Sequence, residues 1–340
     1  MGIALVTGGA GFVGSHLVDH LLDQDLDVRV LDNLTTGSLR NLQSAAEHHV
    51  TAGSDGLQRR QRRLELMIGD VRDERLVRKA MHHVDVVFHL AAVAAGHASP
   101  TNASEVHAVN VHGTLNVLQA ATAEGVRRVV FASCQSVYGQ ATGEPIVEDT
   151  PAAPVTVAGA SKLAAETYCR AYHAARHVEA VCLRYFAVYG PRQSLSGGLI
   201  PGLIETLRRR RRPVVPGDAR AGHDLLYVDD AVAATLAAAS TAGAAGHAIN
   251  VGSGHLASAT EIVELLNHLL RTDAVLRVKR PANGNHVRAG IGLAQRALSW
   301  SPRVSLVAGL AKTVRFFEEA ERPEEGLLAE VGSGEERPDF

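Results

Sequence analysis

The sequence predicts an α/β fold in which a doubly wound parallel sheet is followed by a smaller, mixed α/β domain. Over residues 1–184, short apolar runs alternate with stretches of helical length, as expected for parallel strands joined by crossover helices. Beyond residue 184 glycine and proline break the chain into shorter pieces. We therefore expect a first domain at 1–184, to which some later segments return, and a second domain mainly at 185–320. The polar tail at 321–340 is expected to be disordered.

A glycine-rich turn between the first strand, residues 3–6, and a helix that opens at Phe12 predicts a dinucleotide site. Three glycines fit the spacing G-x-G-x-x-G: Gly9, Gly11 and Gly14. Glycine lets a pyrophosphate approach the backbone, and the N–H groups of the helix start receive its charge. The next strand, 28–31, ends at Asp32, where a carboxylate would hold a ribose 2′-OH and repel a 2′-phosphate. The sequence therefore predicts a Rossmann-type domain that binds NAD rather than NADP.

Further strands and helices extend this pattern. Strands are expected at 64–68, 84–90, 128–133 and 178–184, and helices at 103–124, 157–177, 201–207, 229–239, 260–270 and 305–320. Ligands bind at the carboxyl ends of such strands, and these residues fall there: Asp32, Asp70, Ala91, Ser133 and Tyr185. Asp70 has two open roles, as the N-cap of a helix that starts near Asp73 or as an acceptor for the adenine amino group.

Composition excludes several classes of protein. The chain has 340 residues and a formal net charge of -2, so no general attraction to nucleic acid or anionic membrane is implied. Its three cysteines lack metal-ligand spacing, and we expect no metal. No secretory signal or membrane-spanning run is visible, so a cytoplasmic protein is expected. Two arginine-rich segments, 59–63 and 208–212, are interpreted as solvated surface.

Several motifs together resemble one known family. They are Gly69-Asp70-Val71-Arg72-Asp73, His89-Leu90-Ala91-Ala92, Asn110-Val111-His112-Gly113-Thr114, Val137-Tyr138-Gly139, Ser161-Lys162 and Arg184-Tyr185-Phe186-Ala187-Val188-Tyr189-Gly190-Pro191. With the glycine turn, they resemble the extended short-chain dehydrogenase/reductase family. Within it, the chain is most similar to the NAD-dependent nucleotide-sugar epimerases and dehydratases, especially the UDP-hexose and UDP-uronate 4-epimerases. The resemblance covers about residues 2–318.

The resemblance implies a reaction and a set of site residues. In this family a tyrosine takes a sugar hydroxyl proton while hydride passes to bound NAD, and an epimerase returns the hydride to the other face of the ketose. A lysine, here Lys162, binds the nicotinamide ribose and lowers the tyrosine pKa. The implied cofactor-binding residues are Gly8, Gly11, Phe12, Val13, Gly14, Asp32, Asn33, Thr36, Gly37, Asp70, Val71, Leu90, Ala91, Ala92, Asn110, Ser133, Lys162, Tyr185 and Val188.

The catalytic tyrosine of the family is missing. It should stand four residues before Lys162, one helical turn away, but that position is Ala158. Tyr168 projects from a different helix face, and Tyr172 is roughly 21 Å farther along the axis. Tyr138 is normally a structural residue in this family. None of these tyrosines is expected to supply the general base.

Other expected substrate positions also depart from the family pattern. Cys134 occupies the serine or threonine position; we favour a buried, inert thiol there over a thiol whose pKa falls beside Lys162. Ala187, His223 and Gly292 replace a usual asparagine, arginine and aspartate, whereas Arg288 matches a phosphate-binding arginine. Arg192 could bind a uronate carboxylate or form a surface salt bridge. The implied substrate-binding residues are Cys134, Ala187, Arg192, Leu199, His223 and Arg288.

Three functions remain open at this point. The first is a UDP-hexose or UDP-hexuronate 4-epimerase that oxidises C4 transiently, with water or Cys134 relaying the proton. The second is a catalytically silent homologue that binds NAD and nucleotide sugar. The third is a 4,6-dehydratase, but dehydratases carry an Asp-Glu pair where this chain has Gln135 and Ser136. Relatives pair the helices at 103–124 and 157–177 into a four-helix bundle, so a homodimer is also expected.

Overall fold

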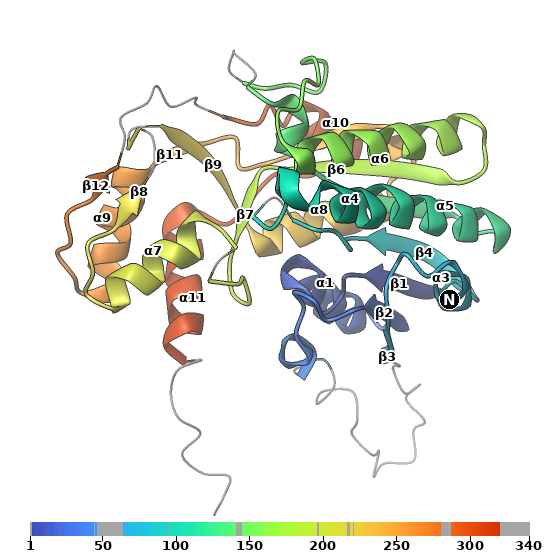
Figure 1. Ribbon diagram of the computed structural model, residues 1–340, viewed down its shortest axis with the longest axis horizontal. Coiled ribbons are helices and arrows are strands. Elements are labelled where there is room, and N and C mark those ends of the chain that lie inside the picture. Colours follow the sequence, from blue (N-terminus) through green and yellow to red (C-terminus); the bar gives the residue numbers. More distant parts are fainter. Residues whose placement is uncertain are drawn as a thin grey trace, which may run out of the picture.

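The computed structural model describes residues 2–43, 45, 64–94, 96–140, 145–195, 197–215, 218–219, 221–279 and 287–319. Its central feature is a parallel sheet of seven strands in the order β10-β6-β5-β4-β1-β2-β3 (Figure 1). The strands are β1 (Ile3–Thr7), β2 (Val28–Asp32), β3 (Leu64–Ile68), β4 (Val84–His89), β5 (Arg128–Cys134), β6 (Glu179–Tyr185) and β10 (Ala248–Val251). The predicted Rossmann-type, doubly wound sheet is confirmed.

Helices cover both faces of this sheet. One face packs on α1 (Phe12–Asp23) and α8 (Val228–Ser240), and the other on α3 (Glu74–Ala80), α5 (Gly113–Ala123) and α6 (Val157–Ala174). The central strands are nearly continuous apolar runs because both of their faces are buried. Since β10 and α8 come after residue 184, segments from the second half of the chain complete the sheet layer. The division of the chain into domains at that residue stays a prediction.

The long helix expected at 103–124 is interrupted. It consists of α4 (Ala103–His107), a π-helical turn at Ala108–His112, and α5. The side-chain amide of Asn110, in the turn, bonds both backbone groups of Val93, and the Asn110 carbonyl accepts the Thr114 hydroxyl. The contacts with Val93 reach outside the helix, which is why the local apolar pattern did not reveal the turn.

The second half of the chain builds a smaller part, on the left of Figure 1. It holds a sheet of β11 (Leu256–Ser258), β9 (Gly222–Tyr227) and β7 (Ala187–Tyr189), and a pair of β12 (Arg277–Val278) and β8 (Val214–Val215). Its helices are α7 (Leu199–Arg208), α9 (Ala259–Leu270) and α11 (Leu306–Glu319), whereas α10 (Gly292–Leu298) packs against β10 and α8 of the larger part. The helices predicted at 201–207, 229–239, 260–270 and 305–320 are confirmed, but the short strands and α10 were missed.

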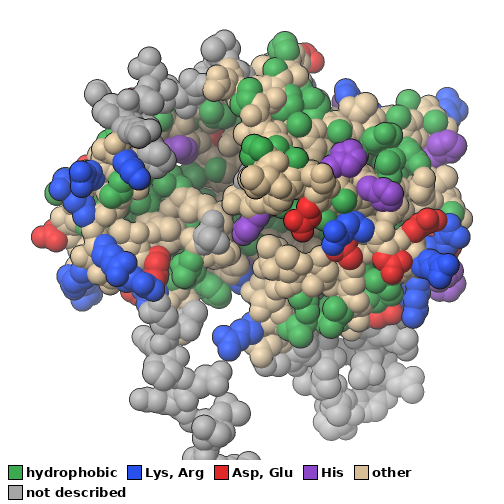
Figure 2. Space-filling model, viewed as in Figure 1, with side chains coloured by type: hydrophobic (Ala, Val, Ile, Leu, Met, Phe, Trp, Pro, Cys, Tyr) green, Lys and Arg blue, Asp and Glu red, His purple; other side chains and the backbone are tan. Residues whose placement is uncertain are grey.

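The arginine run at 208–212 follows α7, and Arg209 to Arg212 are exposed as expected. Figure 2 shows Lys and Arg side chains on the surface of this smaller part and also of the larger one. The segment 59–63 and the tail at 321–340 lie outside the described residues. Among the helices that are described, none combines the length and the apolar character needed to span a bilayer.

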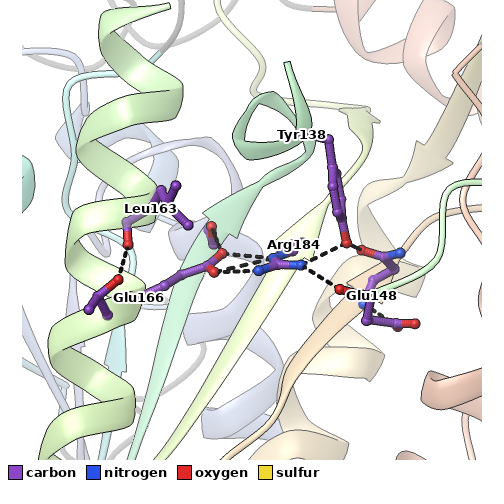
Figure 3. Close-up of polar contacts among 8 residues, drawn as sticks. Tyr138, Glu148, Leu163, Glu166 and Arg184 are labelled. Carbon is purple, nitrogen blue, oxygen red and sulfur yellow. Dashed lines mark hydrogen bonds and ion pairs between the residues drawn. The ribbon is translucent and has the colours of Figure 1, made fainter. Parts of the chain in front are cut away.

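A buried ion pair fastens α6 to the sheet. Glu166 is 0% exposed and accepts hydrogen bonds from Arg184 Nε and, at 2.7 Å, from Arg184 Nη2 (Figure 3). Ser133 Oγ donates to the same carboxylate at 2.5 Å. The Glu166 carboxylate therefore joins α6 to both β5 and β6. Its hydrogen bonds and its ion pair with Arg184 compensate for the burial of its charge.

Replacing this acid should destabilise the fold strongly. Glu166→Ala leaves the Arg184 guanidinium buried without its counter-ion, and we expect a loss of about 3–5 kcal/mol in the free energy of unfolding. Urea denaturation followed by circular dichroism measures it. Glu74→Ala is the matched control, because Glu74 and Arg78 form an exposed pair on α3 and should contribute about 0.5 kcal/mol or less. Similar losses in both variants would contradict the assignment.

Candidate cofactor and active site

The carboxyl ends of five strands meet at one edge of the large sheet. Thr7 pairs in register with Leu31 and His89, and Cys134 pairs with Tyr185. The strand ends named by the sequence, at Asp32, Ser133 and Tyr185, therefore lie along this edge, with Ala91 and Asp70 just beyond β4 and β3. Because neighbouring strands are parallel, loops that are distant in the chain converge on one site.

The turn after β1 has the shape that a dinucleotide needs. Gly8 has φ +71°, and a Cβ atom there would lie 2.7 Å from the backbone nitrogen of Ala91. A Cβ atom at Gly14 would overlap the Gly8 carbonyl oxygen. Gly11 is the N-cap of α1 and provides no side-chain cap, so the first N–H groups of α1 are left for a ligand. Phe12 and Val13 begin this helix and are half-buried.

Asp32 is held in place by backbone donors. Its Oδ2 accepts from Ala10 N at 2.9 Å and its Oδ1 from Leu34 N at 2.8 Å. Carboxylate oxygens can each accept more than one hydrogen bond, so both remain able to accept ribose hydroxyls. Gly37 lies against this carboxylate, because a Cβ there would be 3.0 Å from Asp32 Oδ1, while Asn33 and Thr36 are exposed beside it. The cradle and the carboxylate together fit an NAD molecule.

Asp70 is not a helix cap, so that prediction was wrong. The N-cap of α3 is Asp73, whose Oδ1 accepts from Arg75 N and Leu76 N, because it is the residue next to the first helical turn. Asp70 instead binds the Arg72 guanidinium through both of its oxygens and accepts from Asn33 Nδ2 at 2.8 Å. Hydrogen bonds from Arg72 lower the pKa of Asp70 to about 2. Its proposed contact with adenine stays a prediction, as does the assignment of the neighbouring buried Val71 to the cofactor site.

A buried hydrogen-bonded chain supports the edge below the glycine turn. Thr114 Oγ1 donates to the Asn110 carbonyl, so it must accept from His89 Nε2 at 3.0 Å. His89 Nδ1 then accepts from Thr7 Oγ1 at 2.7 Å, and Thr7 Oγ1 accepts from Ala91 N. Each donor in this chain has an acceptor when the His89 imidazole is neutral and carries its hydrogen on Nε2. Burial, together with the charge of Lys162, lowers the pKa of His89 to about 3. Leu90 and Ala92 flank Ala91 and are half-buried.

Lys162 lies at the same edge. It is 7% exposed, and its Nζ donates to the Ala132 carbonyl at 2.6 Å and lies 4.7 Å from the centre of the Phe131 ring. Burial lowers the pKa of Lys162, and the nearby Cys134 is the first of the groups that oppose this. One turn earlier, Ala158 is 4% exposed and its carbonyl accepts from Ser161 Oγ. Asn110 Nδ2 donates to the same hydroxyl at 2.9 Å.

The other tyrosines of this region are engaged elsewhere. Tyr168 is 41% exposed on the outer side of α6, and the Tyr172 ring packs against His177. Tyr138 is buried, and its hydroxyl donates to Asn250 Oδ1 at 2.7 Å. The hydroxyl of Tyr185 is bonded to Thr235 of α8, and burial raises its pKa. Position 158 therefore has no substitute phenol among these side chains.

The predicted substrate residues come from several segments. Cys134 ends β5, Ala187 lies in β7, Leu199 begins α7 and His223 lies in β9. Val188, predicted for the cofactor, follows Ala187 in β7. A parallel bridge pairs His223 with Val287, which brings it next to Arg288. The two positions expected at the diphosphate are thus neighbours. Burial lowers the pKa of His223. Gly292 begins α10.

Arg192 is paired with a residue of the cofactor helix. Its Nη1 lies 2.7 Å from Asp19 Oδ2, and both side chains are largely buried. His16, also on α1, donates through Nε2 to the Pro191 carbonyl at 3.0 Å. This arrangement corresponds to the salt-bridge interpretation of Arg192, although the pair is more buried than a surface pair.

Sequence reasoning missed several residues that shape the site. Glu166, Asp224 and Asn250 are buried and hold neighbouring backbone or side chains. Glu166 could have been found, because it stands four residues after Lys162 on the same face of an apolar helix. The described residues contain no group of three or more His, Cys, Asp or Glu side chains that could bind a metal.

The neutral state of His89 predicts a pH dependence of stability. Its folded pKa lies below its ordinary value of 6.5, so between pH 6.5 and about 3 the unfolded chain binds a proton that the native chain does not. Stability from this site is therefore lost as pH falls through that window, by up to about 1.4 kcal/mol per pH unit. Urea unfolding at pH 6.5 and 4.5 should show a clearly smaller loss for His89→Gln than for the wild type. The exposed His107→Gln should behave as the wild type, and equal losses in all three proteins would disprove the assignment.

Comparisons with known proteins agree with this geometry. The model of the NAD dependent epimerase/dehydratase family matches residues 4–252. The UDP-glucose 4-epimerase of Mycolicibacterium smegmatis is 34% identical over 319 residues, covering 92% of this chain and 97% of that protein. The structure of UDP-glucose 4-epimerase from Thermotoga maritima with UDP-glucose is 29% identical with a TM-score of 0.83, covering 94% of this chain and 99% of that chain. A double mutant of dTDP-glucose 4,6-dehydratase from Streptomyces venezuelae, solved with NAD bound, is 31% identical with a TM-score of 0.81, covering 93% and 97%. The chain therefore belongs to the NAD-dependent epimerase/dehydratase family, enzymes that act on nucleotide sugars with NAD as cofactor.

Proposed function

We propose that this chain is a UDP-sugar 4-epimerase that acts on a UDP-hexose or UDP-hexuronate. The observation that carries the proposal is the placement of the buried Lys162 ammonium at the end of β5, beside Cys134 and on the same sheet edge as Asp32 and the glycine turn. The names of the similar proteins support a UDP-sugar. The adjacent His223 and Arg288 offer a polar and a cationic group to its diphosphate.

The residues at this sheet edge fit NAD, and each can be assigned to one part of the cofactor. The turn from Gly8 to Gly14 would receive the pyrophosphate, and Asp32 the adenosine ribose. An ammonium group has three donors, and one of those of Lys162 is used by the Ala132 carbonyl. The others can hold the nicotinamide ribose. When bound, NAD supplies a reversible hydride acceptor.

Proton transfer is the step of the proposed reaction for which position 158 provides no side-chain acid or base. Ala158 carries no acid or base at the position one turn before Lys162, and loss of a general base typically reduces a rate by about 10²–10⁴-fold. We propose that water, or the half-buried Cys134 thiol, relays the proton from the sugar hydroxyl.

Restoring the phenol tests the proposal. Ala158→Tyr should raise the rate of C4 epimerisation by about 10²-fold or more, because it returns a general base to the helix face of Lys162. Purified protein is incubated with UDP-glucose, UDP-galactose, UDP-glucuronate and UDP-N-acetylglucosamine, and the C4 epimer is followed by NMR. Ala160→Tyr is the matched control, since position 160 is exposed on the other side of α6. Absence of any epimer from both the wild type and Ala158→Tyr would refute the epimerase assignment.

A silent homologue is the second candidate, and Ala158 is the observation that favours it. Such a protein would bind NAD and a UDP-sugar normally without producing an epimer from any substrate. A 4,6-dehydratase fits less well. The positions after Cys134 are Gln135 and Ser136, in the 3₁₀ turn Gln135–Tyr138, where a dehydratase would need carboxyl groups.

We also propose that two copies associate through α5 and α6. These helices lie side by side, and a shallow groove between them is lined by Gln119, Thr122, Ala123, Ala171, Tyr172, Ala175 and His177. Sedimentation velocity at micromolar concentration should show a dimer, and Ala171→Glu should shift it toward monomer by placing a charge in the contact. Ala160→Glu, outside the groove, should leave the dimer intact. A wild-type protein that sediments only as a monomer would exclude this arrangement.

A further inference from the structure

We propose that Asn250 is a positioning residue for Arg288, and that it ties the diphosphate end of the substrate site to the strand that ends beside Lys162. The inference rests on the proposed function, which assigns Arg288 to the substrate diphosphate. Asn250 lies in β10 and is 0% exposed. It is far from both Lys162 and Arg288 in the sequence. Figure 3 shows the contact between Arg184 and Tyr138, and the Tyr138 hydroxyl in turn bonds Asn250.

The first half of the connection runs from Asn250 to Arg288. Asn250 Nδ2 donates to the Ile146 carbonyl at 2.9 Å. The backbone of Ile146 then bonds on both sides of Ala289, the residue after Arg288, since Ile146 N donates to the Arg288 carbonyl at 2.8 Å and Gly290 N donates to the Ile146 carbonyl at 2.7 Å. The carbonyl that Asn250 holds is thus the one that accepts from the segment carrying Arg288.

The second half runs from Asn250 back to the sheet edge. Arg184 Nη1 donates to Tyr138 Oη at 2.8 Å, and Tyr138 passes its single hydrogen to Asn250 Oδ1 at 2.7 Å. An arginine can only donate, so the phenol must donate onward, and the Asn250 amide is forced to turn its Nδ2 toward Ile146. Arg184 in turn is fixed by Glu166, which holds Ser133 next to Cys134.

A second set of hydrogen bonds holds Ala289, the residue that follows Arg288. Ala289 N donates to Asp224 Oδ2 at 2.9 Å, and the other donors to this buried carboxylate are Ser253 N, Ser253 Oγ and Gly254 N. Arg288 stands outside any named helix or strand. The segment that carries it is bonded to Ile146, to Asp224 and, through Val287 N, to the Gly222 carbonyl, and Asn250 acts on the bonds made through Ile146.

The test measures binding, so it does not depend on turnover. Full-length protein with saturating NAD is titrated with uridine, UMP and UDP by calorimetry. Arg288→Gln should weaken UDP binding by about 10- to 100-fold, the loss of a charge-assisted hydrogen bond, with uridine binding unchanged. Asn250→Ala should weaken UDP binding by about three- to tenfold, again with uridine unchanged. In the Arg288→Gln background the same substitution should cost less than about twofold, because the two residues act as one unit.

Controls separate positioning from general damage. Tyr138→Phe keeps the ring and removes only the hydroxyl link, so it should repeat the UDP-selective loss at about two- to fivefold, and it replaces Asn250→Ala if that variant does not fold. Asn267→Ala removes a comparable amide, which clamps Ala274 and Thr272 after α9, and should leave UDP binding unchanged.

The outcomes distinguish two failures. If Arg288→Gln weakens UDP binding but the effect of Asn250→Ala is the same in both backgrounds, or extends equally to uridine, the positioning role is refuted while the proposed site stands. If Arg288→Gln leaves UDP binding unchanged, the assignment of Arg288 to the diphosphate fails, and the positioning role fails with it.

Discussion

The buried pair of Glu166 and Arg184 is the contact on which the site depends. The helix α6 carries both Lys162 and position 158, and more than twenty residues of chain separate it from the end of β5 that it must face. A carboxylate and a guanidinium that are almost completely removed from water leave little freedom, because any separation would strand a charge in the apolar interior. Ser133 and Tyr138 satisfy the remaining polar atoms of the pair. The position of Lys162 over the end of β5 follows from this arrangement.

Much of the first half of the fold could be predicted from the sequence because its signals are local. Apolar runs with small residues after them gave the bounds of β1 to β6 to within about a residue, and the glycine turn gave the start of α1. The cap role considered for Asp70 was wrong because Asp70 and Asp73 stand three residues apart, and only the start of the helix decides which of them caps it. The π turn at Ala108–His112 was missed since its cause, the contacts of Asn110 with Val93 and Ser161, lies outside the helix.

The second half was harder to predict for a different reason. Strands such as β7 and β11 have three residues each, too few to show a period of two. Asn250 and Asp224 bond to groups far away in sequence, so nothing near them in the chain marks their role. The site itself was predicted mainly by resemblance, and the same comparison exposed Ala158. The groups that we propose for binding NAD and nucleotide are distinct from position 158, so such a binding site does not require a phenol there.

The π turn also has a consequence for length variation in this helix. Such a turn is equivalent to one residue inserted into an α-helix, and removing that residue would rotate everything after it by about 100°. Thr114, which holds His89, and Asn116, which donates to the Val71 carbonyl, would then swing off their partners although every side chain was retained. A one-residue deletion between Ala108 and His112 would therefore make the helix regular but break the contacts of Thr114 and Asn116. A one-residue gap in an alignment at this point thus implies a larger structural change than a substitution.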